Sequence, residues 1–221
     1  MTKPISILIV DDHPIIVEAY KSALEHLNKN DDTVVFNINS AINTDDVLKK
    51  LTFSNFDIVF LDIRIPPSSD NTIISGEDLG LKIREKLPTV KIVVSTMFND
   101  NTRINSIFKT LDPDAFLIKD DITKSTIIDA LQSVLDNQPF YSKTVLKLLR
   151  KIAKNDYILD KIDRQLLFYL SKGIKTKDLT QHIALSSTGI ERRKRQLKAI
   201  FGKENCSDSE LLRVAEEKGF I

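Results

Sequence analysis

Residues 57–62, with the sequence Asp57-Ile58-Val59-Phe60-Leu61-Asp62, show most clearly the pattern on which the predicted fold rests. Four consecutive apolar residues of this kind are typical of a strand buried on both faces, and the run ends in a carboxylate. Similar runs recur along the first 120 residues, at Ile5–Val10, Thr33–Ile38, Lys91–Ser95 and Ala115–Ile118. Amphipathic stretches with helical spacing separate them. Strands that alternate with helices predict an α/β fold with a doubly wound, five-stranded parallel sheet.

The helices of this sheet are predicted from the spacing of apolar residues. They fall at about 15–27, 79–87, 100–110 and 123–136. Pro88 ends the second of them, because a helix rarely runs through proline.

The composition bounds the class of protein. The chain has 221 residues, 42% hydrophobic and 29% charged, which excludes a disordered chain and fits one large domain or two small ones. Cys206 is the single cysteine, so no internal disulfide forms and a reducing compartment is expected. No apolar run approaches the ~18 residues of a membrane helix, and no signal-peptide pattern is visible. We therefore expect a cytoplasmic protein that does not enter a membrane.

The two parts of the chain carry opposite charge. Residues 1–142 contain 14 basic and 21 acidic residues, a net charge of −7, whereas residues 143–221 contain 18 and 10, a net charge of +8. A basic domain favours an anionic partner, and nucleic acid is the first candidate. The alternative is a solvated, Lys-rich helical face.

The alternation of strands and helices stops at about Gln138-Pro139. A Lys-rich amphipathic stretch, Lys143–Lys154, follows, and every later periodic segment is helical. These segments are Lys161–Leu170, Thr176–Ala184 with Thr176 as N-cap, Thr188–Phe201 with a capping box from Thr188 to Glu191, and Ser207–Glu217. The short connection Leu185-Ser186-Ser187 indicates a helix-turn-helix. We predict an α/β domain at 1–138, a linker with an amphipathic helix at 139–156, and a small four-helix domain at 157–221.

Polar side chains stand where four of the predicted strands end: Asp11 and Asp12, Asp62, Ser95-Thr96, and Lys119. In a doubly wound sheet, functional groups gather at these ends. Three carboxylates repel each other unless a cation lies among them, and Mg²⁺ prefers oxygen ligands. A metal-neutralised carboxylate can attack phosphorus, while a hydroxyl and an ammonium can bind phosphoryl oxygens. Taken singly, each Asp could be a helix cap and Lys119 a solvated side chain. The combination favours a phosphoryl-transfer site.

These residues lie in stretches that resemble the receiver domain of two-component response regulators, over about residues 1–138. The matching stretches are Ile7–Pro14, Asp57–Pro66, Ile92–Thr96 and Ala115–Asp120. The resemblance implies that Asp62 accepts a phosphoryl group from a sensor histidine kinase, with Mg²⁺ as cofactor. It also implies the ligands of the ion: Asp12 directly, Asp11 through water, Asp62, and the backbone carbonyl of Arg64.

The resemblance further implies the groups that respond to the phosphoryl group. Thr96 would donate a hydrogen bond to it, and Lys119 would form an ion pair with it. Phe116 stands where the family often has an aromatic residue that swings inward with Thr96; it could equally be a plain buried strand residue. One departure is a longer polar loop, Pro67–Gly76, where the family usually makes a short turn.

The second part resembles the four-helix output domain of the NarL/LuxR class of response regulators, over about residues 157–221. The resemblance rests on the order and spacing of Leu159–Leu167, Leu170–Leu179, Ile183–Ser186, Gly189-Ile190 and Leu197–Gly202. It implies binding to double-stranded DNA, with the second helix of the helix-turn-helix in the major groove. The implied contacts are Lys175, Thr176, Lys177, Thr188, Arg192, Arg195 and Lys198. It also implies a homodimer when phosphorylated.

The predicted recognition helix departs from the family pattern at four positions. Gly189 and Arg193 replace a usual Thr and His, and Lys194 falls in the apolar seam of the helix, so that its stem must snorkel or the helix must rotate. Glu191 stands where a Lys often contacts DNA; a carboxylate repels phosphates but can accept from a cytosine amino group.

The sequence therefore predicts a response regulator, not an enzyme, in which phosphorylation of Asp62 controls DNA binding and transcription. One alternative is a regulator whose output domain binds a protein partner, which Gly189, Glu191 and Lys194 suggest. Another is a Mg²⁺-dependent phosphatase with Asp62 as nucleophile, to which the basic helical domain lends no support.

Overall fold

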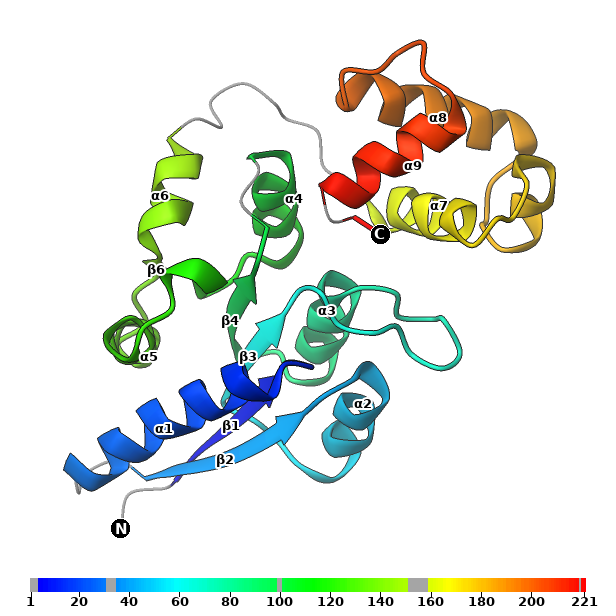
Figure 1. The fold of residues 1–221 in the computed structure, drawn as a ribbon. Helices are drawn as coiled ribbons and strands as arrows, with labels where there is room; N and C mark the ends of the chain where they lie inside the picture. Colours follow the sequence, from blue (N-terminus) through cyan, green and yellow to red (C-terminus); the bar gives the residue numbers. More distant parts are fainter. Residues whose placement is uncertain (1–3, 31–34, 99–100, 151–158, 219) are drawn as a thin grey trace.

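The computed structural model describes residues 4–30, 35–98, 101–150, 159–218 and 220–221 (Figure 1). In this part of the chain a parallel sheet has the strand order β2-β1-β3-β4-β5-β6. The strands are β1 (Ile5–Val10), β2 (Phe36–Ala41), β3 (Ile58–Asp62), β4 (Lys91–Thr96), β5 (Ala115–Ile118) and β6 (Phe140–Tyr141). The predicted doubly wound parallel sheet is confirmed. The predicted strand Thr33–Ile38 begins outside the described residues, and β2 continues to Ala41.

The sheet contains one strand more than the five that the sequence predicts. β6 is two residues long and pairs in parallel with β5, with Phe140 opposite Ala115 and Tyr141 opposite Phe116. It lies in the segment predicted as linker. Two residues are too short to produce a periodic pattern, and the pairing depends on β5, which is distant in sequence.

Helices cover both faces of the sheet. α1 (Pro14–Asn30) and α5 (Lys124–Leu135) enclose one core with the strand residues Ile7, Phe60 and Leu117. On the other face, α2 (Thr44–Phe53), α3 (Gly76–Lys86), α4 (Asn101–Leu111) and α6 (Lys143–Leu149) enclose a second core with Leu8, Val59 and Phe116. Since alternate strand residues point to opposite faces, both sets must be apolar, which explains the continuous apolar runs.

Residues 159–218 and 220–221 form a separate helical unit with its own core, which includes Leu166, Leu179, Leu197 and Leu211. Its elements are α7 (Lys161–Ser171), the 3₁₀-helix η2 (Thr176–Gln181), α8 (Ser187–Ile200) and α9 (Asp208–Glu217). This is the predicted small helical domain. No helix among the described residues has the length and apolar character needed to span a membrane.

Two local predictions in this unit were wrong. The segment predicted as an α-helix at Thr176–Ala184 is a shorter 3₁₀-helix whose N-cap is Lys175. Thr176 is the first residue of this helix, and its hydroxyl accepts a hydrogen bond from Lys194. α8 begins one residue earlier than predicted, so Ser186 caps it by accepting from the Gly189 N–H at 3.2 Å. The expected capping box between Thr188 and Glu191 is therefore not the cap of this helix.

The structure describes the long loop completely but the predicted linker only in part. α6 ends at Leu149, and residues 151–154 of the predicted linker helix lie outside the described residues. The loop from Pro67 to Ser75 is closed by its own hydrogen bonds: the Ser68 N–H donates to the Ile73 carbonyl at 2.8 Å. Bonds from Ser68 and Thr72 lower the pKa of Asp70 to about 2. Its tip thus has a defined conformation.

Candidate functional site

The predicted acidic residues come together because their strands are neighbours. β1 and β3 pair in parallel with Val10 opposite Leu61. Asp11 and Asp62, the next residue of each chain segment, therefore lie side by side at the same edge of the sheet. In the sheet β4 lies next to β3 and β5 lies next to β4. Lys119 directly follows the last residue of β5. The three side chains are almost fully buried, each with no more than 4% of its surface exposed.

Lys119 bridges the two buried carboxylates. Its Nζ lies 2.7 Å from Asp62 Oδ2 and 2.7 Å from Asp11 Oδ2. The second oxygen of Asp62 accepts the Arg64 N–H at 3.0 Å. One oxygen of Asp62 is thus paired with an ammonium and the other with a backbone donor, an arrangement that fixes the orientation of the carboxylate.

Burial and pairing shift both pKa values. Burial raises the pKa of the Asp62 carboxyl above its ordinary value, against the opposing effects of Lys119 and the Arg64 N–H. Burial alone would lower the pKa of Lys119, but Asp62 and Asp11 outweigh it, so the pKa stands above its ordinary value. Lys119 therefore remains a cation at neutral pH.

The cluster has the donor set of a hard-cation site. Ligand atoms of Asp11, Asp12, His13 and Asp62 lie within 4.8 Å of one another. The buried carboxylates face the more exposed Asp12, whose side chain is 37% accessible, so one side of the cluster is open. Three carboxylates at this spacing fit Mg²⁺, which prefers oxygen ligands and keeps several waters. That the Arg64 backbone carbonyl is a further ligand of the ion remains a prediction.

His13 is a neighbour of the site that the sequence analysis did not single out. The ring Nδ1 of His13 lies 2.7 Å from Asp12 Oδ1 and 3.1 Å from Asp11 Oδ1. The backbone N–H of His13 donates to Asp11 Oδ1 at 2.9 Å. The signal in the sequence was its position immediately after the acidic pair.

Thr96 and Phe116 lie deeper than the cluster. Thr96 ends β4, is fully buried, and accepts the Phe98 N–H on its Oγ1 at 3.2 Å. Phe116 is fully buried too, with its ring stacked 5.8 Å from that of Phe108. Phe108 in turn contacts Tyr141, with ring centroids 5.0 Å apart. In this structure Phe116 is therefore a core residue.

The predicted DNA contacts divide into two groups. Lys175, Lys177, Thr188, Arg192 and Arg195 are exposed. Thr176 and Lys198 are engaged: the Thr176 hydroxyl accepts from Lys194, while Lys198 pairs with Asp208 at 3.0 Å and donates to the Cys206 carbonyl at 2.6 Å.

Two further basic residues of α8 hold the helical unit together. Arg193 pairs with Asp160 at 2.8 Å and with the buried Asp163 at 3.1 Å. Lys194 is buried, and its Nζ lies 2.6 Å from Asp208. The Lys194 ammonium does not reach into solvent as expected, because the partly exposed Asp208 carboxylate of α9 compensates its charge.

The two units meet at a buried junction that the sequence analysis did not predict. Arg164 of α7 donates to Asp78 of α3 at 2.7 Å. Next to it, Glu77 pairs with Arg103 of α4 through both carboxylate oxygens, at 2.9 and 2.7 Å. The Arg103 guanidinium lies over the ring of Phe98 and over that of Phe220 from the helical unit, 5.4 and 4.5 Å from the centroids.

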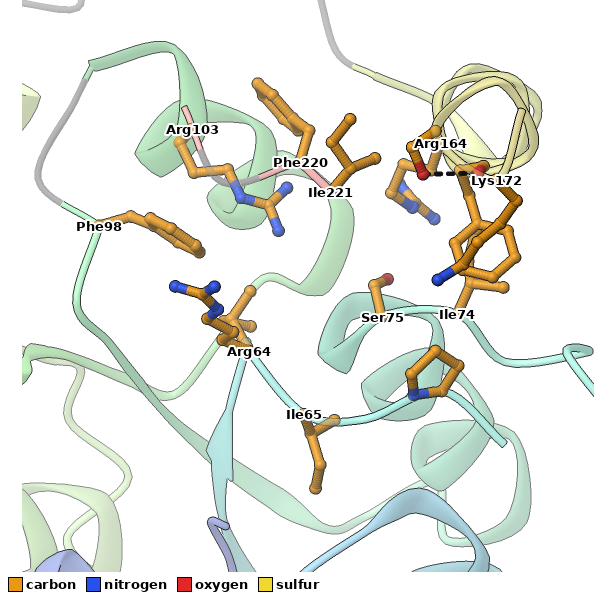
Figure 2. Close-up of a pocket in the computed structure, with 14 residues that line it drawn as sticks. Arg64, Ile65, Ile74, Ser75, Phe98, Arg103, Arg164, Lys172, Phe220 and Ile221 are labelled. Atoms are coloured by element: carbon orange, nitrogen blue, oxygen red, sulfur yellow. Dashed lines mark hydrogen bonds between the residues drawn. The ribbon is translucent and has the colours of Figure 1, made fainter. Parts of the chain in front are cut away.

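Figure 2 shows the cavity at this junction. It has a volume of about 210 Å³ and is lined from both units, with Arg64, Phe98 and Arg103 on the α/β side and Arg164, Lys172 and Phe220 on the helical side. Phe98 follows Thr96 by two residues. A path of contacts thus runs from Thr96 through Phe98 and Arg103 to Phe220.

Comparison with protein families adds a match over more than half of the chain. The sequence model described as "Response regulator receiver domain" matches residues 7–132. The matched region contains the acidic cluster and Lys119 but not the helical unit.

Full-length relatives resemble both parts. The "Transcriptional regulatory protein YdfI" of Bacillus subtilis (strain 168) is 25% identical, covering 97% of each chain. The "Oxygen regulatory protein NreC" of Staphylococcus epidermidis is 22% identical, covering 85% of this chain and 87% of that protein. Among solved structures, RcsB from Salmonella enterica serovar Typhimurium, bound to promoter rprA in the presence of phosphomimetic BeF₃⁻, has a TM-score of 0.68 at 19% identity and covers 97% and 99% of the two chains. The likeness to that structure concerns the fold of the whole chain.

Proposed function

Since this chain belongs to the response regulators that carry a receiver domain, we propose that it accepts a phosphoryl group on Asp62 and that this modification controls DNA binding by its helical unit. The observation that carries the proposal is the pairing of the buried Asp62 with Lys119 at 2.7 Å, beside Asp11 and Asp12. The proposed domains are the receiver at 1–138, the linker at 139–156 and the output domain at 157–221.

The chemistry proposed for Asp62 is nucleophilic. A carboxylate oxygen attacks the phosphorus of a phosphohistidine in a sensor histidine kinase, the bond from phosphorus to the imidazole nitrogen breaks, and that nitrogen keeps the electron pair. Asp11, Asp12 and Asp62 would hold Mg²⁺, which would supply positive charge to offset that of the carboxylates and the phosphoryl oxygens. Lys119, already a cation, pairs with a phosphoryl oxygen, and the Arg64 N–H keeps the carboxylate oriented.

The proposed switch runs through Thr96. Its hydroxyl turns to the phosphoryl group and gives up its bond to the Phe98 N–H. Phe98 then shifts against Arg103, and the contacts of Arg103 with Phe220 loosen. Phosphorylation adds charge and acceptors at one point, and the junction between the two units is the element whose equilibrium it shifts.

The proposed output is binding to double-stranded DNA. Thr188, Arg192 and Arg195 lie exposed on α8, the second helix of the helix-turn-helix, and Lys175 and Lys177 lie exposed at the start of η2. The first set suits the major groove and the second a phosphate. The related RcsB structures include dimers bound to DNA. We propose that this chain, too, binds as a homodimer when phosphorylated, on half-sites about one helical turn apart.

The phosphorylation step is tested by intact-mass spectrometry after incubation with Mg²⁺ and a small phosphoryl donor. Wild type should gain one phosphoryl group, and Asp62→Asn should gain none. A control, Asp57→Asn, removes a carboxylate at the opposite end of the same strand and should be labelled normally. Repeated turnover of the donor with no labelled protein would instead support the phosphatase alternative. Equal labelling of wild type and Asp62→Asn would contradict the assignment.

A further inference from the structure

We propose that Glu191 is a specificity-determining residue that selects a cytosine in the DNA site. The inference rests on the proposed DNA binding and adds to it the base that one side chain reads. It explains why a carboxylate stands on the exposed face of a helix otherwise suited to an anionic partner.

The buried residues of α8 fix which face it presents. Ile190, Lys194 and Leu197 are buried, so the opposite side faces outward. Ser187, Thr188, Glu191, Arg192 and Arg195 are all exposed. They occupy the first two and a half turns of the helix, the part of a recognition helix that contacts base edges. Glu191 therefore lies among the residues placed to read bases.

The exposed face of α8 carries less positive charge than its sequence suggests, because several of its basic residues are paired with carboxylates. Arg193 is engaged by Asp160 and Asp163, and Lys194 and Lys198 are both engaged by Asp208. Within the described part of the chain, no ion pair involves Arg192 or Arg195. The outward face of α8 thus offers two guanidinium groups and one carboxylate. A face of this kind attracts phosphates weakly and must gain its affinity from directional contacts.

The Glu191 carboxylate is held by a lysine that is itself fixed. Lys194 Nζ lies 3.4 Å from Glu191 Oε1, 2.9 Å from the Thr176 hydroxyl and 2.6 Å from Asp208 Oδ2. These three partners match the three N–H donors of an ammonium. Because Lys194 is only 7% exposed, it cannot follow Glu191 into solvent. The contact draws the 55% exposed Glu191 side chain toward Lys194 and leaves its other oxygen available to a ligand.

The chemistry of the base edges then selects cytosine. In the major groove cytosine presents an amino donor, which a carboxylate accepts. Guanine and thymine present acceptors there, which repel a carboxylate, and adenine places an acceptor next to its amino group. Against phosphates the same charge is unfavourable. Glu191 should therefore raise discrimination between bases while it lowers affinity for DNA of any sequence.

The test selects binding sites from a random duplex pool with the full chain, Mg²⁺ and beryllofluoride, for wild type, Glu191→Gln, Glu191→Ala and a control, Glu216→Gln. Glu216 is exposed on α9, so its substitution changes the net charge equally, away from α8. Wild type and the control should select cytosine at one position of the half-site. Both Glu191 variants should lose that preference by about tenfold, the usual value of one good base contact, and bind random DNA more tightly.

Two results overturn the inference and differ from each other. If Glu191→Gln and Glu191→Ala select the same site as wild type with the same preference, Glu191 reads no base, although the chain binds DNA. If none of the four proteins enriches or retains duplex DNA even at low salt, the proposed DNA binding fails, and the inference fails with it.

Discussion

Arg164 of α7 and Asp78 of α3 form an ion pair 2.7 Å long across the junction of the two units, with only 2% and 5% of their side chains exposed. Ser75, the cap of α3, donates to the other oxygen of Asp78, and Arg164 also donates to the Leu159 carbonyl. In such a pair the mutual attraction offsets the cost of burying both charges, whereas loss of either partner leaves a buried charge uncompensated. The junction is therefore sensitive to small changes.

Removing one partner of this pair should open the junction. Arg164→Ala and Asp78→Ala each remove a contact whose loss costs about 3–5 kcal/mol when the remaining charge stays buried. The units should instead separate and hydrate that charge, so the radius of gyration measured by small-angle X-ray scattering should increase. Lys82→Ala, which breaks the exposed pair of Lys82 with Glu85 on the same helix, is the matched control and should leave it unchanged. Identical scattering from all four proteins would show that the pair does not hold the junction.

Gly76→Ala should destabilise the α/β unit. A Cβ at this position would lie 2.5 Å from the backbone oxygen of Asp62 and 2.6 Å from the Cα of Ile63, so the backbone next to the acidic cluster must move. Overpacking of this kind costs about 1–3 kcal/mol. Gly189→Ala is the opposite case: its nearest neighbour would be the Ser186 hydroxyl at 3.4 Å, and alanine in a helix is favourable by up to ~1 kcal/mol. The melting temperature should fall for Gly76→Ala and rise for Gly189→Ala. A Gly76→Ala protein as stable as wild type would show that the backbone does not approach Gly76 this closely.

Magnesium should stabilise the protein through Asp12. A ligand that binds only the folded state at ten times its dissociation constant adds about 1.4 kcal/mol. Addition of Mg²⁺ should therefore raise the melting temperature of wild type and of Glu25→Gln, a control in which an exposed acid of α1 is removed. Asp12→Asn should show a much smaller rise. An equal rise in all three proteins would place the ion elsewhere.

The stability of the helical unit should depend on pH through Asp208. Burial acts to raise its pKa, but hydrogen bonds and charge from Lys194 and Lys198 outweigh it and hold the pKa below its ordinary 3.8. Because the folded-state pKa is the lower one, the stabilisation is fully present above pH ~4 and is lost as the pH falls through the folded-state value. The carboxylate is 40% exposed, so solvent screening limits the effect to about 0.5–1 kcal/mol.

Asp208→Asn provides the measurement for this dependence. Its melting temperature should fall below that of wild type at pH 7, and the difference should shrink as the pH decreases below about 4. A difference that is constant across this range would mean that packing, not the charge of Asp208, accounts for the loss.

The sequence predicted the sheet and its acidic edge because both follow from local patterns. Buried parallel strands read as apolar runs, and Asp11, Asp62 and Lys119 each directly follow or end such a run. The register of neighbouring strands then brings these residues together, with no further information needed. β6 was missed because two residues are too few to show the alternation of apolar and polar residues typical of a strand. Its pairing also depends on β5, which is distant in sequence.

Helix α2 was also missed, although its cap Asn43 is local. The other missed features depend on contacts between distant residues. Glu77 and Asp78 in the first turn of α3 have an ordinary explanation in the helix dipole, so nothing in the sequence indicated that each binds an arginine from another element. Likewise, the sequence placed Lys194 in the apolar seam of α8 but did not indicate which carboxylates pair with Arg193 and Lys194. Their partners Asp163 and Asp208 belong to other helices and are recognisable only in the folded chain.

Fluorescence anisotropy with random duplex DNA across a salt series, with and without Mg²⁺ and beryllofluoride, measures whether the state of Asp62 controls DNA binding. Counterion release makes binding weaken as salt increases. We expect salt-sensitive binding that tightens with beryllofluoride in wild type and does not respond in Asp62→Asn. Binding that is absent in both states at low salt, or that tightens equally in Asp62→Asn, would contradict this expectation.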